Sequence, residues 1–345
     1  MKIIIEKNIL IKINELFDFS KFSKIAVLTD VNIPMALVDR IEESLNKKLK
    51  KIIIPAGENK KNIETVKKIW ETMFKNNFDR SSLLINLGGG VVCDLGGFSA
   101  ATFMRGIDFL NVPTTLLAQV DACIGGKTGI DFLDIKNGVG TFKDPIGVII
   151  DVDTLKTLPK RELVSAFGEI IKHGVISGRK NFGLVTSKKP EKFSQDELIK
   201  IIKQSIKIKS DIVKKDPKEK DLRKVLNFGH TIGHAIESLS WKSDKPLLHG
   251  ESVTIGMIAE TNLASSNLRG CTAKDFTLIK KAIVNAGLPT KVKDITLKDV
   301  IKIISSDKKN TDGIINWSLP KRIGKVLVNV NVQEDLVIEA IKSII

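Results

Sequence analysis

The sequence predicts an α/β domain followed by a mainly helical domain. Up to about residue 155, short runs rich in β-branched residues alternate with amphipathic helical patterns, which is typical of a parallel sheet with crossover helices. Beyond that point the pattern changes to long helical periodicities. A chain of 345 residues is also too long for one small core. We therefore expect one domain over residues 1–155 and a second over 156–345.

The first domain is expected to contain five strands and two helices, and a further helix after the glycines that end the third strand. The strands are expected at 24–30, 50–57, 82–90, 109–115 and 145–151, and the helices at 34–49 and 64–77. In the second domain, apolar residues recur at three- and four-residue steps over 194–216, which predicts a helix there. Alternating residues around Lys321 to Gly324 predict a small hairpin within 313–332.

The composition suits a folded protein in a reducing compartment. Cys93, Cys123 and Cys271 lie far apart without a C-x-x-C pair, so neither a disulfide framework nor a thiolate zinc site is indicated. The first residues lack the pattern of a signal peptide, and no apolar run reaches membrane-spanning length. We therefore expect a cytoplasmic protein with no membrane partner.

The net charge of +15 raises nucleic-acid binding as an alternative function. The lysines, however, are scattered through amphipathic segments, and only 5% of residues are aromatic. This pattern favours solvated helix faces and an anionic small-molecule substrate over a nucleic-acid partner.

A glycine-rich turn follows the strand expected at 82–90. Gly88, Gly89 and Gly90 precede a helix expected to open with Asp94, and bare backbone amides at such a point suit a pyrophosphate. The dinucleotide fingerprint G-x-G-x-x-G is not met, because Cys93 replaces its third glycine, and a turn without a ligand is the alternative. A second near match, DACIGGKT, has Asp121 where a P-loop requires glycine, so an ATPase is rejected.

Histidines and carboxylates form a candidate metal site. All four histidines lie between residues 173 and 249. Helical spacing places Glu169, Lys172 and His173 on one face, and His230, His234 and Glu237 on another, and His249 follows. Two histidines and one carboxylate would leave positions open for substrate hydroxyls. Spacing does not say whether His230 and His234 both bind metal, and a buried structural histidine remains the alternative for each.

The combined motifs identify a family. GGGVVCDLGGF, ATFMRG, VPTTLLAQVDACIGGKTGID, KNGVGTF, GEIIKHG, LRKVLNFGHTIGHAIE and LLHGESVTIGM resemble those of 3-dehydroquinate synthases, in order from about Asp30 to Lys309. The resemblance implies a Rossmann-like N-terminal domain, a helical C-terminal domain and a homodimer. It implies a carbon-oxygen lyase of the shikimate pathway, which supplies aromatic amino acid biosynthesis. Such enzymes convert 3-deoxy-D-arabino-heptulosonate 7-phosphate to 3-dehydroquinate and phosphate with recycled NAD and zinc or cobalt.

The resemblance also implies a role for each matching residue. The metal ligands would be Glu169, His230 and His249, while His234 stays free as an acid/base group. The other catalytic residues would be Lys127, Lys172, Lys209, Arg223, Asn227 and Glu219. The substrate-binding residues would be Arg105, Asp121, Lys136, Asn137, Lys308 and Lys309. The NAD-binding residues would be Asp30, Asn32, Glu58, Lys61, Gly89, Gly90, Asp94, Thr114, Thr115, Lys127 and Lys136. A substrate with a carboxylate and a phosphate calls for such Arg and Lys groups.

Three positions depart from the family pattern. Cys93 stands for glycine, Phe103 for tyrosine, and Lys143 for the histidine of the frequent FHQP motif. None of them removes an expected ligand or acid/base group. Two enzyme alternatives share the metal site: a polyol or alcohol dehydrogenase that releases NADH, and a cyclase for another sugar phosphate.

Overall fold

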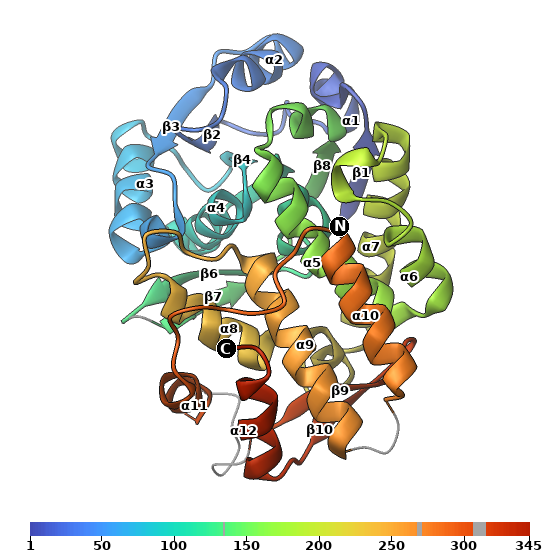
Figure 1. Ribbon diagram of the computed structural model, residues 1–345. Helices are drawn as coiled ribbons and strands as arrows, with labels where there is room; N and C mark the ends of the chain where they lie inside the picture. Colours follow the sequence, from blue (N-terminus) through green and yellow to red (C-terminus); the bar gives the residue numbers. More distant parts are fainter. Residues whose placement is uncertain (134, 268–270, 306–314) are drawn as a thin grey trace. The chain divides into compact units, whose positions relative to one another are not determined.

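The computed structural model describes residues 1–133, 135–267, 271–305 and 315–345, and Figure 1 traces them in order along the chain. The chain divides into two compact units, Met1–Leu158 and Pro159–Ile345. The change of texture in the sequence near residue 155 falls inside the 3-10 helix Val152–Thr157, just before the division after Leu158.

A six-stranded sheet forms the centre of the first unit. Its strand order is β1-β8-β5-β4-β2-β3, and every neighbouring pair is parallel. The strands are β1 (Lys2–Glu6), β2 (Ile25–Asp30), β3 (Lys50–Ile54), β4 (Leu83–Gly88), β5 (Asp108–Pro113) and β8 (Gly147–Asp151). The predicted α/β class with a parallel sheet is thereby confirmed. The sequence patterns missed β1, which pairs with β8 at the sheet edge.

Helices cover both faces of this sheet. They are α1 (Ile13–Leu16), α2 (Met35–Leu45), α3 (Ile63–Lys75) and α4 (Gly90–Thr102). Successive residues of β2 enter two separate cores: Val27 packs with α1 and α2, while Leu28 packs with α3 and α4. Because successive side chains of a strand point to opposite faces, both sets are buried. This explains why the strands read as continuous apolar runs.

The strand order sets where a ligand fits. The chain leaves β2 for β3 on one side and then returns across β2 to β4, so the strand order reverses between β2 and β4. In open parallel sheets, ligands bind beyond the carboxyl ends of the strands at such a reversal. Asp30 ends β2 and Gly88 ends β4.

A second, two-stranded sheet was not predicted from the sequence. Its antiparallel strands are β6 (Lys127–Phe132) and β7 (Ile135–Phe142), and β6 packs on α4. Glycines are needed at this contact: a β-carbon on Gly97 of α4 would collide with the side chain of Thr128. The hairpin places Lys127, Lys136 and Asn137 in the first unit.

The second unit is mainly helical, as expected. Its helices are α5 (Lys160–Ser177), α6 (Arg179–Val185), α7 (Gln195–Lys215), α8 (His230–Ser240), α9 (His249–Asn267), α10 (Ala273–Asn285), α11 (Leu297–Ser305) and α12 (Glu334–Lys342). The predicted hairpin is present as β9 (Trp317–Arg322) and β10 (Lys325–Val330). Within the described ranges, no helix is both long and apolar enough to cross a membrane.

Close packing of α8 against α9 positions most of the histidines. Gly233 of α8 faces Ser252 and Val253 of α9, where an added β-carbon would come within 3.0 Å of the Ser252 carbonyl oxygen. On the opposing helix, a β-carbon on Gly256 would collide with the backbone of Gly229. The absence of side chains at these positions lets the two helices approach closely, so their histidines meet.

Candidate active site

In the first unit, the residues expected to bind the nucleotide follow the carboxyl ends of four adjacent strands. Asp30 ends β2, Glu58 and Lys61 follow β3, and the glycine turn follows β4. Thr114 and Thr115 follow β5, and the Thr114 amide donates to the Gly88 carbonyl oxygen, joining two of these strand ends. The backbone N–H of Asn32 donates to Asp30 Oδ1, with 2.8 Å between the two atoms. Burial raises the pKa of Asp30, and the bond from Asn32 partly offsets this.

The glycine turn exposes backbone amides at the start of α4. Gly89 caps this helix without any side-chain hydrogen bond, and the helix begins at Gly90, one turn before the expected Asp94. A β-carbon on Gly89 would lie 3.1 Å from the Thr115 methyl group, and one on Gly90 would lie 3.3 Å from that of Ala122. The amides and the partial positive charge of the helix end therefore suit an anionic group that approaches closely.

The departure at Cys93 leaves this turn intact. Its buried side chain points into the unit, with Sγ 3.8 Å from the Gly88 carbonyl oxygen. The thiol therefore occupies the interior, and the amides of the turn stay bare.

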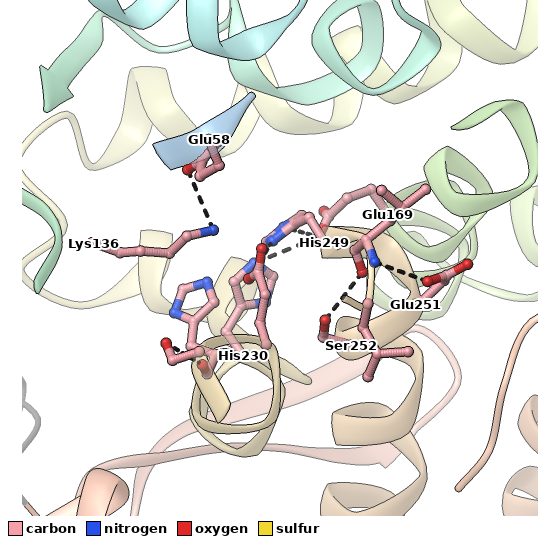
Figure 2. A network of polar contacts seen from close by, with 12 residues as sticks. Glu58, Lys136, Glu169, His230, His249, Glu251 and Ser252 are labelled. Carbon is pink, nitrogen blue, oxygen red and sulfur yellow. Dashed lines mark hydrogen bonds and ion pairs between the residues drawn. The ribbon is translucent and has the colours of Figure 1, made fainter. Parts of the chain in front are cut away.

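A buried lysine neutralises the carboxylate nearest this turn. Lys61 is 4% exposed, and its Nζ lies 2.5 Å from Asp94 Oδ2 and 2.5 Å from Asn137 Oδ1. Burial would lower the pKa of Lys61, but the carboxylates of Asp94 and Glu58 outweigh this and raise it. Lys136 forms an ion pair with Glu58 at 3.3 Å, as Figure 2 shows. The network therefore joins α4, the segment after β3 and the β6–β7 hairpin.

The loop that carries Arg105 has an unusual backbone. Met104, Arg105 and Gly106 have φ of 48°, 70° and 115°, and Arg105 is exposed. Left-handed backbone in non-glycine residues is uncommon and clusters at functional sites. Lys143, which replaces the family histidine, donates its Nζ to the Ile107 carbonyl oxygen at 2.7 Å. Lys143 therefore supports this loop from β7's carboxyl end.

The DACIGGKT segment does not form a P-loop. Asp121 lies in a π-helical turn, Ala118–Ala122, and Lys127 begins strand β6 instead of a helix. A phosphate cradle requires a helix directly after the lysine. The rejection of the ATPase function is consistent with this geometry.

In the second unit, a carboxylate and two imidazoles converge, as Figure 2 shows. Glu169 of α5 is fully buried, and its Oε1 lies 3.5 Å from Nε2 of His230 and 3.5 Å from Nε2 of His249. Around a tetrahedral zinc ion with bonds of about 2.0–2.1 Å, neighbouring ligand atoms are separated by roughly 3.3–3.5 Å. These donors therefore fit a divalent metal ion.

In His230 and His249, the hydrogen bond made by Nδ1 leaves Nε2 facing Glu169. His230 Nδ1 lies 3.2 Å from the Phe228 carbonyl oxygen, and His249 Nδ1 lies 3.1 Å from Glu237 Oε2. Both partners accept, so each Nδ1 carries the proton and the Nε2 lone pair of a neutral ring is available to a metal. Burial would lower the pKa of His249, but the carboxylates of Glu237 and Glu169 raise it to about 9. Below that pH, a metal ion that binds Nε2 has to displace its proton.

His234 lies beside this group. Its ring centroid is 4.8 Å from that of His230 and 5.7 Å from that of His249. One ligand atom from each of the three histidines lies within 4.8 Å of the others, so the three rings also form a geometrically possible metal set. The geometry brings together all the expected ligands and His234, and does not choose between the two sets.

Two further side chains of α5 surround Glu169. Lys172 is buried and forms an ion pair with Glu169 Oε2 at 2.5 Å. His173, also buried, places its Nε2 3.9 Å from the same oxygen. Lys172 thus holds a positive charge next to the proposed metal ligands.

Four more of the residues expected in this unit, Lys209, Glu219, Arg223 and Asn227, lie on α7 or in the segment after it. Lys209 of α7 and Arg223 are buried, and Arg223 donates to the Pro217 carbonyl oxygen at 2.7 Å. Asn227 donates to Glu219 Oε1 at 2.8 Å, and Glu219 has a left-handed φ of 56°. Lys308 and Lys309 lie outside the described residues.

Sequence reasoning assigned no role to Glu237, which orients His249. Its position seven residues after His230 placed it on the histidine face, but spacing along one helix says nothing about a partner on another. The contact depends on how α8 packs against α9.

Comparisons with known proteins identify the family. Two family models match consecutive parts of the chain: 3-dehydroquinate synthase N-terminal over residues 51–165 and 3-dehydroquinate synthase C-terminal over 166–310. A 3-dehydroquinate synthase of Parabacteroides distasonis is 38% identical over 342 residues, covering 99% of this chain and 96% of the relative. One from a Thermoanaerobacter species is 43% identical over 328 residues, covering 93% and 90%.

Solved structures share the fold. A 2-deoxy-scyllo-inosose synthase complexed with carbaglucose-6-phosphate, NAD+ and Co2+ superposes with a TM-score of 0.89 at 23% identity, covering 99% of this chain and 96% of that one. A 2-epi-5-epi-valiolone synthase from Streptomyces hygroscopicus with NAD+ and Zn2+ has a TM-score of 0.88 at 23% identity and the same coverage. A probable glycerol dehydrogenase from Sinorhizobium meliloti has a TM-score of 0.70 at 14% identity, covering 99% and 96%.

Proposed function

This chain belongs to the 3-dehydroquinate synthase family, and we propose that it converts 3-deoxy-D-arabino-heptulosonate 7-phosphate to 3-dehydroquinate and phosphate. This reaction is a step of the shikimate pathway, which leads to the aromatic amino acids. The observation that carries the proposal is the convergence of Glu169, His230 and His249, with the buried cation of Lys172 beside them. A polyol that bears anionic groups can use both: a metal ion held by these ligands would bind its hydroxyls, and a buried lysine would bind an anionic group.

NAD and a divalent metal ion are the proposed cofactors. The two related synthases above were solved with NAD+ and with Co2+ or Zn2+. When bound, the metal ion polarises substrate hydroxyls and NAD accepts and returns a hydride. The 3.5 Å separations at Glu169 and the bare amides at Gly89 and Gly90 support sites for these two groups.

Glu169, His230 and His249 would hold the metal ion in the second unit. His234 lies close enough to those rings to move a proton to and from the substrate while leaving the ligands in place. A neutral imidazole has one nitrogen that can accept a proton and one that can donate, which suits a reaction with both proton removal and return. His234 is therefore proposed as the acid/base residue.

Buried cations of the second unit would bind the substrate's charged groups. Lys172, Lys209 and Arg223 all lie in the interior, where charge-assisted hydrogen bonds are stronger than in water. The contact between Asn227 and Glu219 orients the amide for a hydrogen bond to a hydroxyl. Lys308 and Lys309 are proposed as phosphate contacts on the resemblance alone.

In the first unit, the nucleotide would lie along the carboxyl ends of the strands. The Gly89–Gly90 amides suit the pyrophosphate, and Lys61 neutralises the neighbouring Asp94 so that an anion is not repelled. The remaining proposed contacts in this unit come from strand ends and from the β6–β7 hairpin: Asp30, Asn32, Glu58, Thr114, Thr115, Lys127 and Lys136 for NAD, and Arg105, Asp121, Lys136 and Asn137 for substrate.

We also propose a cytoplasmic homodimer. The three cysteines are free and buried, which suits a reducing compartment. The dimer is an expectation from the family, and light scattering on the purified protein would measure it. A monomeric mass at assay concentration would contradict it.

A stoichiometric assay tests the proposed reaction. The conversion involves no net oxidation, so NAD is recycled. Purified protein, substrate, divalent metal ion and substoichiometric NAD should therefore release phosphate far in excess of the NAD supplied, with NADH absorbance near baseline. NADH formed one for one with product, without phosphate, would identify a dehydrogenase. Inactivity on this substrate with turnover of another sugar phosphate would identify a different cyclase.

A further inference from the structure

A buried carboxylate of α9 holds the first turn of the histidine helix α8. Glu260 is fully buried. Its Oε2 accepts the Gly229 amide at 2.5 Å and its Oε1 accepts the Ile232 amide at 3.2 Å. The first amides of a helix have no partner within the helix itself, so these two bonds satisfy groups that would otherwise need water or a cap.

The local sequence cannot supply this cap. Gly229 occupies the capping position with φ of 82° and has no side chain to accept a hydrogen bond. The usual capping residues Ser, Thr, Asp and Asn adopt an extended backbone, and a β-carbon on Gly229 would lie 2.6 Å from Met257 Cγ. The carboxylate therefore has to come from another element.

A negative charge suits this place. The start of α8 carries a partial positive charge, and a buried carboxylate is costly unless it is hydrogen-bonded to such a group. The amides of Gly229 and Ile232, on either side of His230, both donate to Glu260, which fixes the backbone of this turn. They therefore set where its Nε2 lies relative to Glu169.

The two helices thus hold each other's histidines. Glu260 of α9 fixes the turn that carries His230 of α8, and Glu237 of α8 accepts the Nδ1 proton of His249 at the start of α9. Losing the bonds to Glu260 would move the imidazole of His230 away from Glu169, and losing the bond to Glu237 would move that of His249. Neither carboxylate was assigned a role from the sequence.

We propose that Glu260 is a positioning residue of the metal site, which acts through the backbone of α8 and has no contact with the ion. This inference rests on the proposed metal-binding role of Glu169, His230 and His249. Substitutions of residues that orient a metal ligand typically weaken metal affinity by roughly 10- to 100-fold. We expect a loss in this range for Glu260→Gln, because its amide NH2 would face the backbone donors that the second carboxylate oxygen now satisfies.

The test measures metal binding without turnover. Metal-stripped full-length protein is titrated with Zn2+ in competition with a chromophoric chelator, and Co2+ absorption reports the ligand geometry. The matched control is Asp151→Asn: Asp151 is also a buried carboxylate that accepts backbone amides, from Asn8 at 2.9 Å and Leu10 at 3.3 Å, but it lies in the first unit. Glu260→Gln should lose affinity and change the Co2+ spectrum, whereas Asp151→Asn should do neither.

The outcomes separate this inference from the proposed function. Wild-type protein that binds no metal would count against the proposed function. If wild-type protein binds metal, and folded Glu260→Gln binds Zn2+ with the same affinity and gives the same Co2+ spectrum, the positioning role is overturned. If Glu260→Gln does not fold, Glu260→Asp decides: it keeps the charge but shortens the reach, so weaker Zn2+ binding supports the inference and unchanged binding overturns it.

Discussion

Glu237 Oε2 accepts a hydrogen bond from His249 Nδ1 at 3.1 Å, and this contact joins α8 to the first residue of α9. The carboxylate fixes the protonated nitrogen and turns Nε2 toward Glu169. A ligand held in one tautomer and one orientation loses less entropy when a metal ion binds. Glu237 therefore prepares His249 for coordination.

Replacing Glu237 should weaken metal binding. Glu237→Ala removes the acceptor from His249 Nδ1, and we expect roughly 10- to 100-fold lower Zn2+ affinity in a chelator competition. Glu237→Gln keeps an acceptor oxygen, so its loss should be smaller. The control is Asp275→Asn, since Asp275 is a buried carboxylate of the same unit that pairs with Arg179 and not with a histidine. If Glu237→Ala binds Zn2+ as tightly as the wild type does, Glu237 has no positioning role.

Single substitutions should separate the ligands from the acid/base residue. Glu169→Ala, His230→Ala and His249→Ala should each lose bound metal and activity, because each removes a proposed ligand. His234→Ala should keep its metal while its kcat falls by roughly 100-fold or more. Elemental analysis after purification reads out the metal. A metal-free His234→Ala protein with metal retained in Glu169→Ala would instead favour the three-histidine set.

Lys61→Met should destabilise the first unit and weaken NAD binding. The substitution removes the cation that pairs with Asp94 beside the glycine turn, and we expect a loss of about 2–4 kcal/mol in the free energy of unfolding. Urea unfolding and NAD titration measure the two effects. Lys67→Met on the exposed face of α3 is the control and should change stability by less than about 0.5 kcal/mol. Unaltered NAD affinity in Lys61→Met would contradict the proposed placement of the nucleotide.

The contribution of Lys61 to stability should decline at alkaline pH. The pKa of Lys61 is raised in the folded protein because Asp94 and Glu58 outweigh the effect of burial. A raised pKa gives stability that is fully present below the unfolded value of about 10.4 and is lost as the pH rises through the folded value. The stability difference between wild type and Lys61→Met should therefore be constant at neutral pH and narrow above about pH 10. A difference that stays constant into that alkaline range would show that the ion pair is not its source.

Lys143→Met should affect substrate binding more than the chemical steps. Without the bond from Lys143 Nζ to the Ile107 carbonyl oxygen, the left-handed segment at Arg105 loses its support. We expect KM to rise several-fold with kcat changed less than about two-fold, as an interaction made equally before and during the reaction would give. Steady-state phosphate release measures both, and hydrogen exchange of residues 103–107 reports the loop. A lower kcat with unchanged KM would refute a role in binding.

The sequence by itself determined the class of fold and the family. Because both faces of the sheet are buried, strands such as Leu83–Gly88 consist mainly of apolar residues and can be found in the sequence. The capped periodicity of α7 likewise follows from local physics, since Ser194 and Glu197 form a capping box within one turn. The combined motifs, among them those around Gly89, Glu169 and His230, identified the family.

Only the tertiary structure decided how these residues act together. The β6–β7 hairpin was missed because its glycine-rich strands lack an apolar alternation, and Gly97 and Thr128 show that it depends on packing against α4. Glu237 and Glu260 gained their roles through the approach of α8 to α9, which glycines at 233 and 256 permit. Periodicity specifies the face of one helix on which a side chain lies. The partner it meets depends on the packing between helices distant in the sequence, and this packing brings Glu260 to the amide of Gly229.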